Sequence, residues 1–157
     1  MPPTSSALNS AALDADWNPA DCNCLALRQA ARHVTQFYDQ HMAKVGLRST
    51  QYSILSRLNR RGPMSINTLA AEMVMDRTTL GRNILPLERE GLVEIRPDEN
   101  DRRSKAVLLS KAGTARWQQA NKRWKAAQQE FESGFGGLRS AQMRDMLRGV
   151  VATELAA

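Results

Sequence analysis

The 157-residue sequence predicts a mainly α-helical fold with one small β-hairpin, an α+β protein, on three observations. Apolar residues recur at spacings of three and four over long stretches in both halves of the chain, which is the helical period. A β-branched run at residues 92–96 and an apolar run at 106–109 enclose a charged loop, which is typical of a hairpin. The composition, 42% hydrophobic and 24% charged, is that of a globular protein.

The first 21 residues differ in composition from the rest of the chain. Residues 1–21 are rich in Ala, Ser, Asp and Pro without a sustained period, so we expect a flexible N-terminal tail. Residues 22–157 are expected to form a single domain, long enough for a core without disulfide bonds. The tail has no secretory-signal pattern, and no apolar run approaches the ~20 residues that span a bilayer. We therefore expect a cytoplasmic protein with no membrane partner.

Two helices are predicted next. The first runs from Cys22 to Lys44 and ends near Gly46, with an apolar stripe formed by Cys24, Leu27, Ala31, Val34 and Tyr38. The second runs from Ser49 to Arg60, buries Tyr52, Leu55 and Leu58, and stops at Arg61-Gly62-Pro63. The segment Met64-Ser65-Ile66 is expected to form a short strand against the hairpin.

The stretch from Ser65 to Ser110 predicts two short helices joined by a tight turn and followed by the hairpin. Asn67 is expected to cap a helix through Val74. Asp76 is expected to cap a second helix that runs toward Glu90 and stops at Gly91. Helix, turn, helix and hairpin in this order predict a winged helix-turn-helix over residues 49–110.

Two more helices are predicted after the hairpin. Ser110 can cap a long helix from Lys111 to Ser133, and its Trp117 and Trp124, seven residues apart, call for a partner helix. Residues 134–137 break the chain, and a last helix is expected from Ser140 to Leu155. Because the helices of 22–46 and 111–157 carry more apolar surface than a small winged domain needs, we expect them to be dimerisation helices in a homodimer.

The chemistry of the second short helix points to double-stranded DNA. The second helix of a helix-turn-helix enters the major groove, and a neighbouring hairpin reaches phosphates or the minor groove. Side chains that can contact base edges and phosphates occupy the first two turns of this helix: Arg77, Thr78, Thr79, Arg82 and Asn83. Outside it, Arg48 and the arginines of 57–61 would contact phosphates if they face the duplex, with plain surface charge as the alternative.

Bulk charge alone does not identify a DNA-binding surface in this chain. The net charge is +6, but residues 65–110 hold seven basic and eight acidic residues, a net charge of −1. We therefore expect the acidic side chains of this stretch, such as Glu72, Glu90 and Glu94, to pair locally or to point away from phosphates.

The run from Leu69 to Ser110 resembles the MarR family of winged helix-turn-helix transcriptional regulators. The most specific part is the hairpin loop, where Asp101-Arg102-Arg103 and Leu109-Ser110 are similar to the family's D-x-R…L-[TS] signature. The resemblance extends from about Cys24 to Leu155. It implies that Asp101 positions Arg103 toward the minor groove, and Arg102 and Lys105 would then contact phosphates. Pro86 departs from the pattern, and we expect it to kink the second short helix beyond its base-reading residues.

The resemblance implies a sequence-specific transcriptional regulator, a repressor, that binds a pseudo-palindromic operator as a homodimer. Its two recognition helices would lie one helical turn apart, about 34 Å. The alternative is an architectural or non-specific nucleic-acid-binding winged-helix protein. An enzyme is not expected, because His33 and His41 lack a third metal ligand and no phosphate loop or nucleophile motif is present. No cofactor or metal is expected.

Cys22 and Cys24 are candidates for a sensor, because a helix N-terminus and the nearby Arg28 favour thiolate. The first helix is similar to that of the organic-hydroperoxide-sensing branch of the family, whose reactive cysteine matches Cys24 and one of whose tyrosines matches Tyr38. That tyrosine could approach Cys24 only from the other subunit, because 14 helical residues span ~21 Å. Three interpretations stay open for the cysteines: packing in the dimer seam, oxidation, or the wall of a ligand pocket.

The pocket interpretation follows from the same resemblance. Members of the family bind small aromatic acids or phenolic compounds in a cleft between the dimer helices and the DNA-binding region. Here such a cleft would be lined by Leu27, Arg28, Ala31, Arg32, Tyr52 and Met64, with an arginine available for a carboxylate. DNA release would follow either ligand binding or cysteine oxidation.

Overall fold

The computed structural model describes residues 16–155, and residues 1–15 of the flexible tail expected over residues 1–21 lie outside the described residues. The chain divides into two compact units, Met1–Thr35 and Gln36–Ala157, and the boundary falls inside helix α2 (Asn23–Ala43). Before α2, the short 3-10 helix η1 spans Pro19–Asp21. Within the described range, no helix combines the length and the apolar character that a bilayer crossing requires.

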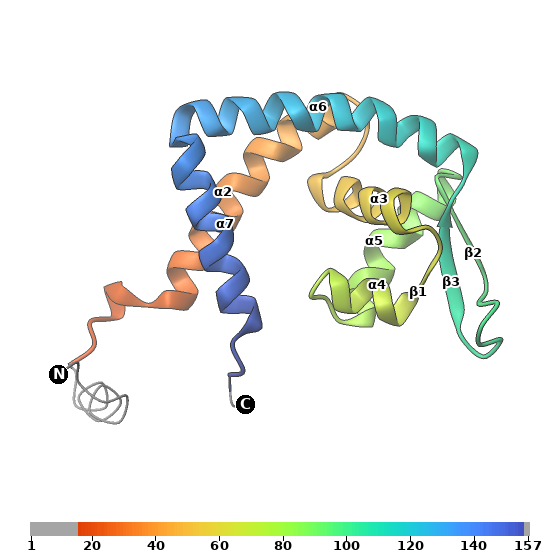
Figure 1. Cartoon of the computed structure of the whole chain (residues 1–157), viewed down its shortest axis with the longest axis horizontal. Helices are drawn as coiled ribbons and strands as arrows, with labels where there is room; N and C mark the ends of the chain where they lie inside the picture. The colour runs from red at the N-terminus through yellow and green to blue at the C-terminus, as the bar shows by residue number, and fades with distance from the viewer. Residues whose placement is uncertain (1–15, 156–157) are drawn as a thin grey trace. The chain divides into compact units, whose positions relative to one another are not determined.

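The second unit contains the predicted winged helix-turn-helix. In chain order, its elements are α3 (Ser49–Arg61), β1 (Met64–Ser65), α4 (Ile66–Glu72), α5 (Arg77–Arg89), β2 (Val93–Pro97) and β3 (Lys105–Leu109). Figure 1 shows α3, α4 and α5 gathered beside the hairpin of β2 and β3. The mainly helical fold with a small antiparallel sheet is confirmed.

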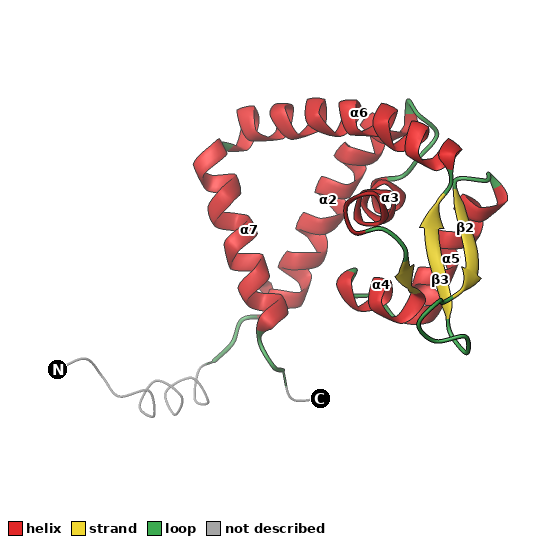
Figure 2. Ribbon diagram, turned by 45° about the vertical axis from the view of Figure 1, so that its right-hand side comes forward, coloured by secondary structure: helices red, strands yellow, loops and turns green. Residues whose placement is uncertain are grey.

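The sheet has three antiparallel strands in the order β1-β3-β2, and Figure 2 shows the β2–β3 hairpin in yellow. The hairpin register pairs Val93 with Leu109 and Pro97 with Lys105. On the other edge of β3, Met64 pairs with Val107, so the short strand expected before the first helix of the helix-turn-helix is confirmed. Strand β2 begins and ends one residue later than predicted, and β3 begins one residue earlier than predicted.

The core of this unit lies where α3, α4, α5 and the hairpin meet. Its side chains are fully or almost fully buried and include Ile54, Leu55, Leu58, Leu69, Leu80, Leu87, Val93 and Val107. On α5 the buried residues are Leu80, Ile84 and Leu87, at spacings of four and three, so this helix places one apolar stripe on the core and leaves the rest of its surface outside.

The last two helices are α6 (Lys111–Phe135) and α7 (Gly137–Ala152). The tryptophan stripe of α6 is covered within the chain, because the Trp117 indole N–H donates to Ser56 Oγ at 3.0 Å and Trp124 stacks on Tyr52. The partner helix that this stripe called for is therefore α3. Trp117 and Trp124 are partly buried by these contacts.

The starts of α4 and α7 differ from their sequence-based prediction. Ser65, and not Asn67, caps α4, because Ser65 has extended backbone and its Oγ accepts the Thr68 N–H at 3.1 Å. The break after α6 is a single residue, Gly136, whose φ of 104° suits only glycine, so α7 begins three residues earlier than expected. Helix α5 continues through Pro86, and the Glu90 N–H bonds to the Pro86 carbonyl at 3.0 Å.

Candidate nucleic-acid interface

The N-terminus of α5 is fixed by Asp76, as its sequence predicts. One carboxylate oxygen of Asp76 accepts the Thr79 backbone N–H at 2.7 Å, and the other accepts the Thr79 hydroxyl at 2.8 Å. These bonds hold the pKa of the Asp76 carboxyl below its ordinary value, so the cap is ionised at neutral pH. A charged cap at a helix N-terminus also interacts favourably with the helix dipole.

The five residues of α5 predicted to contact DNA divide into two groups. The side chains of Arg77, Thr78 and Arg82 are exposed and form no hydrogen bond or ion pair with any residue that the structure describes. Thr79 uses its hydroxyl hydrogen in the cap, and Asn83 donates its amide to the Thr79 carbonyl at 2.9 Å. The first group is therefore the freer to contact a duplex.

The turn between α4 and α5 contains a residue in a left-handed conformation. The Met75 N–H bonds to the Ala70 carbonyl and the Val74 N–H to the Ala71 carbonyl, which is the Schellman pattern at a helix C-terminus. Val74 takes the left-handed position with φ of 53°, and it is 70% exposed. A β-branched residue is strained there, and sequence reasoning missed it because glycine is the usual signal.

The tip of the hairpin, residues 98–104, is folded by two aspartates. The Asp98 side chain accepts the Asn100 N–H at 2.9 Å, and the Asp101 side chain accepts the Arg103 N–H at 3.0 Å. Ser104 N–H returns to the Asp101 carbonyl at 2.9 Å. Asp101 thus holds the backbone of Arg103 and not its guanidinium, and the Arg103 side chain is exposed.

Three basic side chains near the hairpin tip carry no partner among the described residues. Arg102, Arg103 and Lys105 are exposed, and none of their side-chain nitrogens forms an ion pair or hydrogen bond within residues 16–155. A loop with a fixed backbone and three unpaired cations offers donors to phosphate or to the floor of a minor groove. Their contacts with DNA remain predictions.

Three acidic residues of the same stretch pair locally, as expected. Glu72 forms ion pairs with Arg57 and Arg61, Glu94 pairs with Arg96, and Glu90 lies 3.6 Å from Arg116. These three carboxylates are therefore balanced by neighbouring arginines, whereas Glu88, Asp98, Glu99 and Asp101 form no ion pair with a residue that the structure describes. The same pairs occupy Arg57 and Arg61 with Glu72, so these two side chains favour a structural role over the phosphate contact considered from the sequence.

A pocket of about 580 Å³ lies between the loop end of the hairpin and the start of α4. Thr68 and Arg61 line it on one side, and Arg96 and Asn100 line it on the other. Asp98 and Glu99 line it as well, and both arginines are paired with glutamates, so the hollow has mixed charge.

The predicted sensor residues of the first unit lie on the opening turns of α2. Cys22 and Cys24 are exposed free thiols, and Arg28 and Arg32 are exposed as well. Cys22 caps the helix, because its Sγ accepts the Leu25 N–H at 3.4 Å. That capping role was not foreseen from the sequence.

The two tyrosines predicted for the sensor are in the second unit, and both are bonded to α6. Tyr38 Oη donates to Gln128 Oε1 at 2.6 Å, and Tyr52 Oη donates to Asn121 Oδ1 at 2.9 Å. Burial raises the pKa of each phenol, so both are hydrogen-bond donors at neutral pH. Tyr52 is buried in the core, and its part in a ligand cleft stays a prediction.

Comparisons with known proteins agree with this geometry. Residues 47–105 match the model of the MarR family. The transcriptional activatory protein BadR of Rhodopseudomonas palustris is 32% identical over 110 residues, 68% of this chain and 63% of BadR. The transcriptional repressor NicR of Pseudomonas putida is 32% identical over 89 residues, 57% of this chain and 56% of NicR. The chain thus spans less than two thirds of the length of either relative.

A solved structure is similar over most of the chain. The Mycobacterium tuberculosis transcriptional regulator MosR, crystallised in complex with DNA, is 31% identical with a TM-score of 0.73, and the match covers 86% of this chain and all of the MosR chain.

Proposed function

Because the chain belongs to the MarR family of transcriptional regulators, a family of regulators and not of enzymes, we propose that it binds a specific near-palindromic operator as a homodimer. One observation carries the proposal. The exposed side chains of Arg77, Thr78 and Arg82 on α5 and of Arg102, Arg103 and Lys105 on the hairpin have no partner among the described residues, while Glu72, Glu90 and Glu94 are paired with arginines. Free donors of this kind support contacts with phosphates although the stretch has a net charge of −1.

The homodimer is supported by the surface of α7. Met146, Leu147, Val150 and Val151 are exposed by 71%, 40%, 45% and 64%, and Leu138 by 74%. An apolar row of this kind on one helix is costly in water, and a second copy of the same helix can cover it. Dimerisation would carry two recognition helices to successive major-groove faces of the duplex.

We propose repression as the regulatory outcome, in the cytoplasm where an operator is found. The name of NicR supports repression and that of BadR supports activation, so a transcription assay decides between them. A reporter placed behind the operator is expected to fall in expression when the protein is present and to rise when it is deleted. A fall on deletion would assign the protein to activators.

DNA release is proposed to follow a small aromatic or phenolic effector or the oxidation of a cysteine. Exposed thiols at Cys22 and Cys24 support the second route, and the exposed Arg28 and Arg32 support recognition of a carboxylate by the first. Native mass spectrometry with and without oxidant separates the routes, because it detects a retained effector and a modified thiol in one measurement.

The test of DNA recognition is selection of binding sites from a random duplex library, followed by footprinting on the selected site. We expect two symmetric half-sites whose centres lie about one helical turn apart. A specific site should be bound at least about a thousandfold more tightly than random duplex at the same salt. Equal affinity for all sequences would show that the protein is a non-specific nucleic-acid-binding winged-helix protein and not a sequence-specific regulator.

A further inference from the structure

Helix α7 buries little apolar surface against the rest of its unit. Ser140 is its one fully buried residue in the described part of the chain, Met143 is partly buried, and the other large apolar side chains of the helix are exposed. The Ser140 hydroxyl donates to the Gly136 carbonyl at 2.8 Å, so even this buried group makes a polar contact. Polar contacts and the residue that joins α7 to α6 therefore have a large share in setting the direction of α7.

The joint between α6 and α7 is one residue long. Gly136 has φ of 104°, and its N–H donates to the Glu132 carbonyl at 2.9 Å. The backbone of Glu132 thus closes the last turn of α6 at the joint. Its side chain lies on the same end of α6, where it can reach the next helix.

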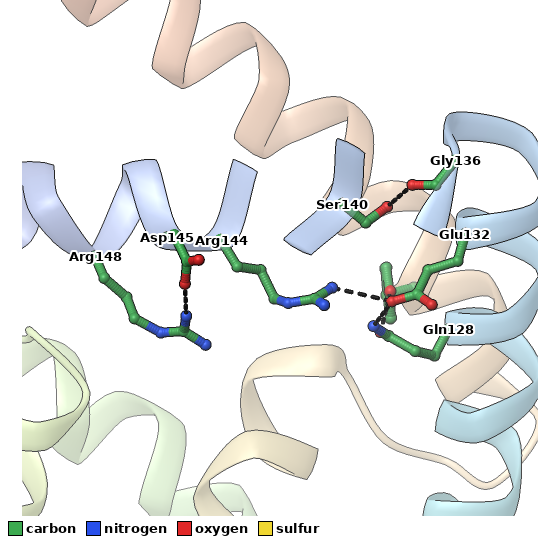
Figure 3. A network of polar contacts seen from close by, with 8 residues as sticks. Gln128, Glu132, Gly136, Ser140, Arg144, Asp145 and Arg148 are labelled. Carbon is green, nitrogen blue, oxygen red and sulfur yellow. Dashed lines mark hydrogen bonds and ion pairs between the residues drawn. The ribbon is translucent and has the colours of Figure 1, made fainter. Parts of the chain in front are cut away.

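The Glu132 carboxylate links α6 to α7. Its Oε1 accepts from Arg144 Nη1 at 3.0 Å and from Gln128 Nε2 at 2.9 Å, and Figure 3 shows both side chains converging on it. The Gln128 amide oxygen in turn accepts the Tyr38 hydroxyl at 2.6 Å. A continuous chain of hydrogen bonds therefore connects the second half of α2, the end of α6 and the middle of α7.

Tyr38 is a permanent donor at the far end of this chain. Burial and the nearby Glu132 carboxylate both raise its pKa, so the phenol keeps its proton at neutral pH. Its ring also packs near Phe131, with the ring centroids 6.2 Å apart. The donor is therefore held by packing, and it fixes which way the Gln128 amide faces.

We propose that Glu132 is the positioning residue that holds α7 at one angle to α6, so that the apolar face of α7 is presented correctly to a second copy. The proposal rests on the homodimer of the proposed function and adds the residue that sets its geometry. In such a dimer, the angle at Gly136 would control the separation of the two winged helix-turn-helix regions, since a change of a few degrees at a joint is amplified along a helix.

A second ion pair on α7 serves as a natural control. Arg148 pairs with Asp145 at 2.6 Å on the same helix, with side chains 70% and 77% exposed, and Figure 3 shows this pair lying along α7. It cannot orient the helix, because both partners move with it. Arg148 and Arg144 also line the same hollow on α7.

The test compares Arg144→Ala and Glu132→Gln with Arg148→Ala in the full chain by sedimentation equilibrium. Each of the first two should raise the dimer dissociation constant by about three- to tenfold, as loss of a half-exposed ion pair implies. Arg148→Ala should stay within about twofold of wild type. The dimer dissociation constant of the double variant Glu132→Gln/Arg144→Ala should not exceed that of the more weakly dimerising single variant, because the two residues share one interaction.

A charge swap separates positioning from a general loss of stability. Glu132→Arg combined with Arg144→Glu rebuilds the pair in reverse and should recover most of the lost dimer affinity. The melting temperature of the winged core should be the same in all variants. A structural defect unrelated to the pair would not be rescued by the swap.

Two outcomes overturn different statements. If wild type dimerises and Arg144→Ala matches Arg148→Ala, the positioning role of Glu132 is wrong while the homodimer stands. If wild type stays a monomer at every concentration, the homodimer is wrong, and amide hydrogen exchange over residues 145–152 then judges the joint in the monomer. Faster exchange in Arg144→Ala than in Arg148→Ala supports the positioning role, and equal exchange refutes it.

Discussion

Gly113 of α6 lies against the carbonyl oxygen of Leu92 so closely that a Cβ added to it would stand 1.9 Å from that oxygen. The same carbonyl accepts the Ser110 N–H at 3.1 Å, so the start of α6 is bonded to the base of the hairpin at this point. The close approach fixes where α6 leaves the winged domain.

Gly113→Ala is expected to destabilise the protein by about 3 kcal/mol, at the upper end of overpacking costs, because the added carbon meets backbone and not a movable side chain. Gly134→Ala in the same helix is the matched control, since nothing lies within 4 Å of its added Cβ. That control should gain about 0.5–1 kcal/mol from helix propensity. Urea unfolding measures both, and a stabilised Gly113→Ala would contradict the contact.

Val74→Gly is expected to raise the free energy of unfolding by about 1 kcal/mol. The left-handed backbone of Val74 is strained, and its 70% exposed side chain contributes little burial that glycine would lose. Gly91 occupies the equivalent position after α5 with φ of 71°, and Gly91→Val should cost about 1–2 kcal/mol. If Val74→Gly proves neutral or destabilising in urea, the turn is not strained.

Arg103→Ala is expected to weaken operator binding by about 1–3 kcal/mol and to leave the dimer intact. The side chain is exposed, and its backbone is held by Asp101, so the substitution removes a donor without unfolding the loop. Lys125→Ala removes one exposed charge from α6 outside the proposed interface and should change affinity little. Fluorescence anisotropy at constant salt compares them, and equal affinities would remove the hairpin from DNA recognition.

Cys24→Ser is expected to keep the protein on its operator after peroxide treatment if oxidation of Cys24 is the release signal. Cys24 is an exposed thiol, and oxidation of its thiolate would place a polar group on the opening turns of α2. Cys22→Ser is the matched control, since its sulfur caps the helix. A gel-shift titration with peroxide reports release. Release of Cys24→Ser equal to that of wild type would assign the signal to a bound ligand.

Asp76→Asn is expected to make the free energy of unfolding depend less on pH between mildly acidic and strongly acidic solution. The folded-state pKa of Asp76 is lowered, so its ionised cap stabilises the fold above the unfolded pKa of about 3.8 and loses that effect as pH falls through the folded value. Wild type should therefore lose its advantage over Asp76→Asn as pH drops below about 4. Urea unfolding of both proteins from pH 7 to pH 3 tests the sign, and a constant difference would contradict it.

Local signals along the chain predicted the winged helix-turn-helix well. The cap at Asp76, the stop at Gly91 and the β-branched run after it all act within a few residues, so they appear in the sequence in the order in which the structure uses them. The cap of α4 was misplaced because Ser65 and Asn67 are both good capping residues. The pairing of β1 with β3 decides between them, since it makes Ser65 the last extended residue before the helix.

The candidate site was predicted as a set of residue types, and the structure sorted them. Arg57 and Arg61 are of a residue type that commonly binds phosphate, but both pair with Glu72. The sequence cannot reveal that pairing, because it joins the end of α3 to the end of α4. The same limit hid the bond from Tyr38 to Gln128, 90 residues apart.

The sequence by itself determined the helices, the hairpin, the turn residues and the family, because periodicity, caps and a short charged motif depend on neighbours along the chain. Only the tertiary structure decided which surfaces are covered. It placed α3 on the tryptophans of α6, seated Gly113 on Leu92 and left the apolar face of α7 open. The physical reason is that burial and close packing arise between residues distant in sequence, and these contacts exist only once the elements have assembled.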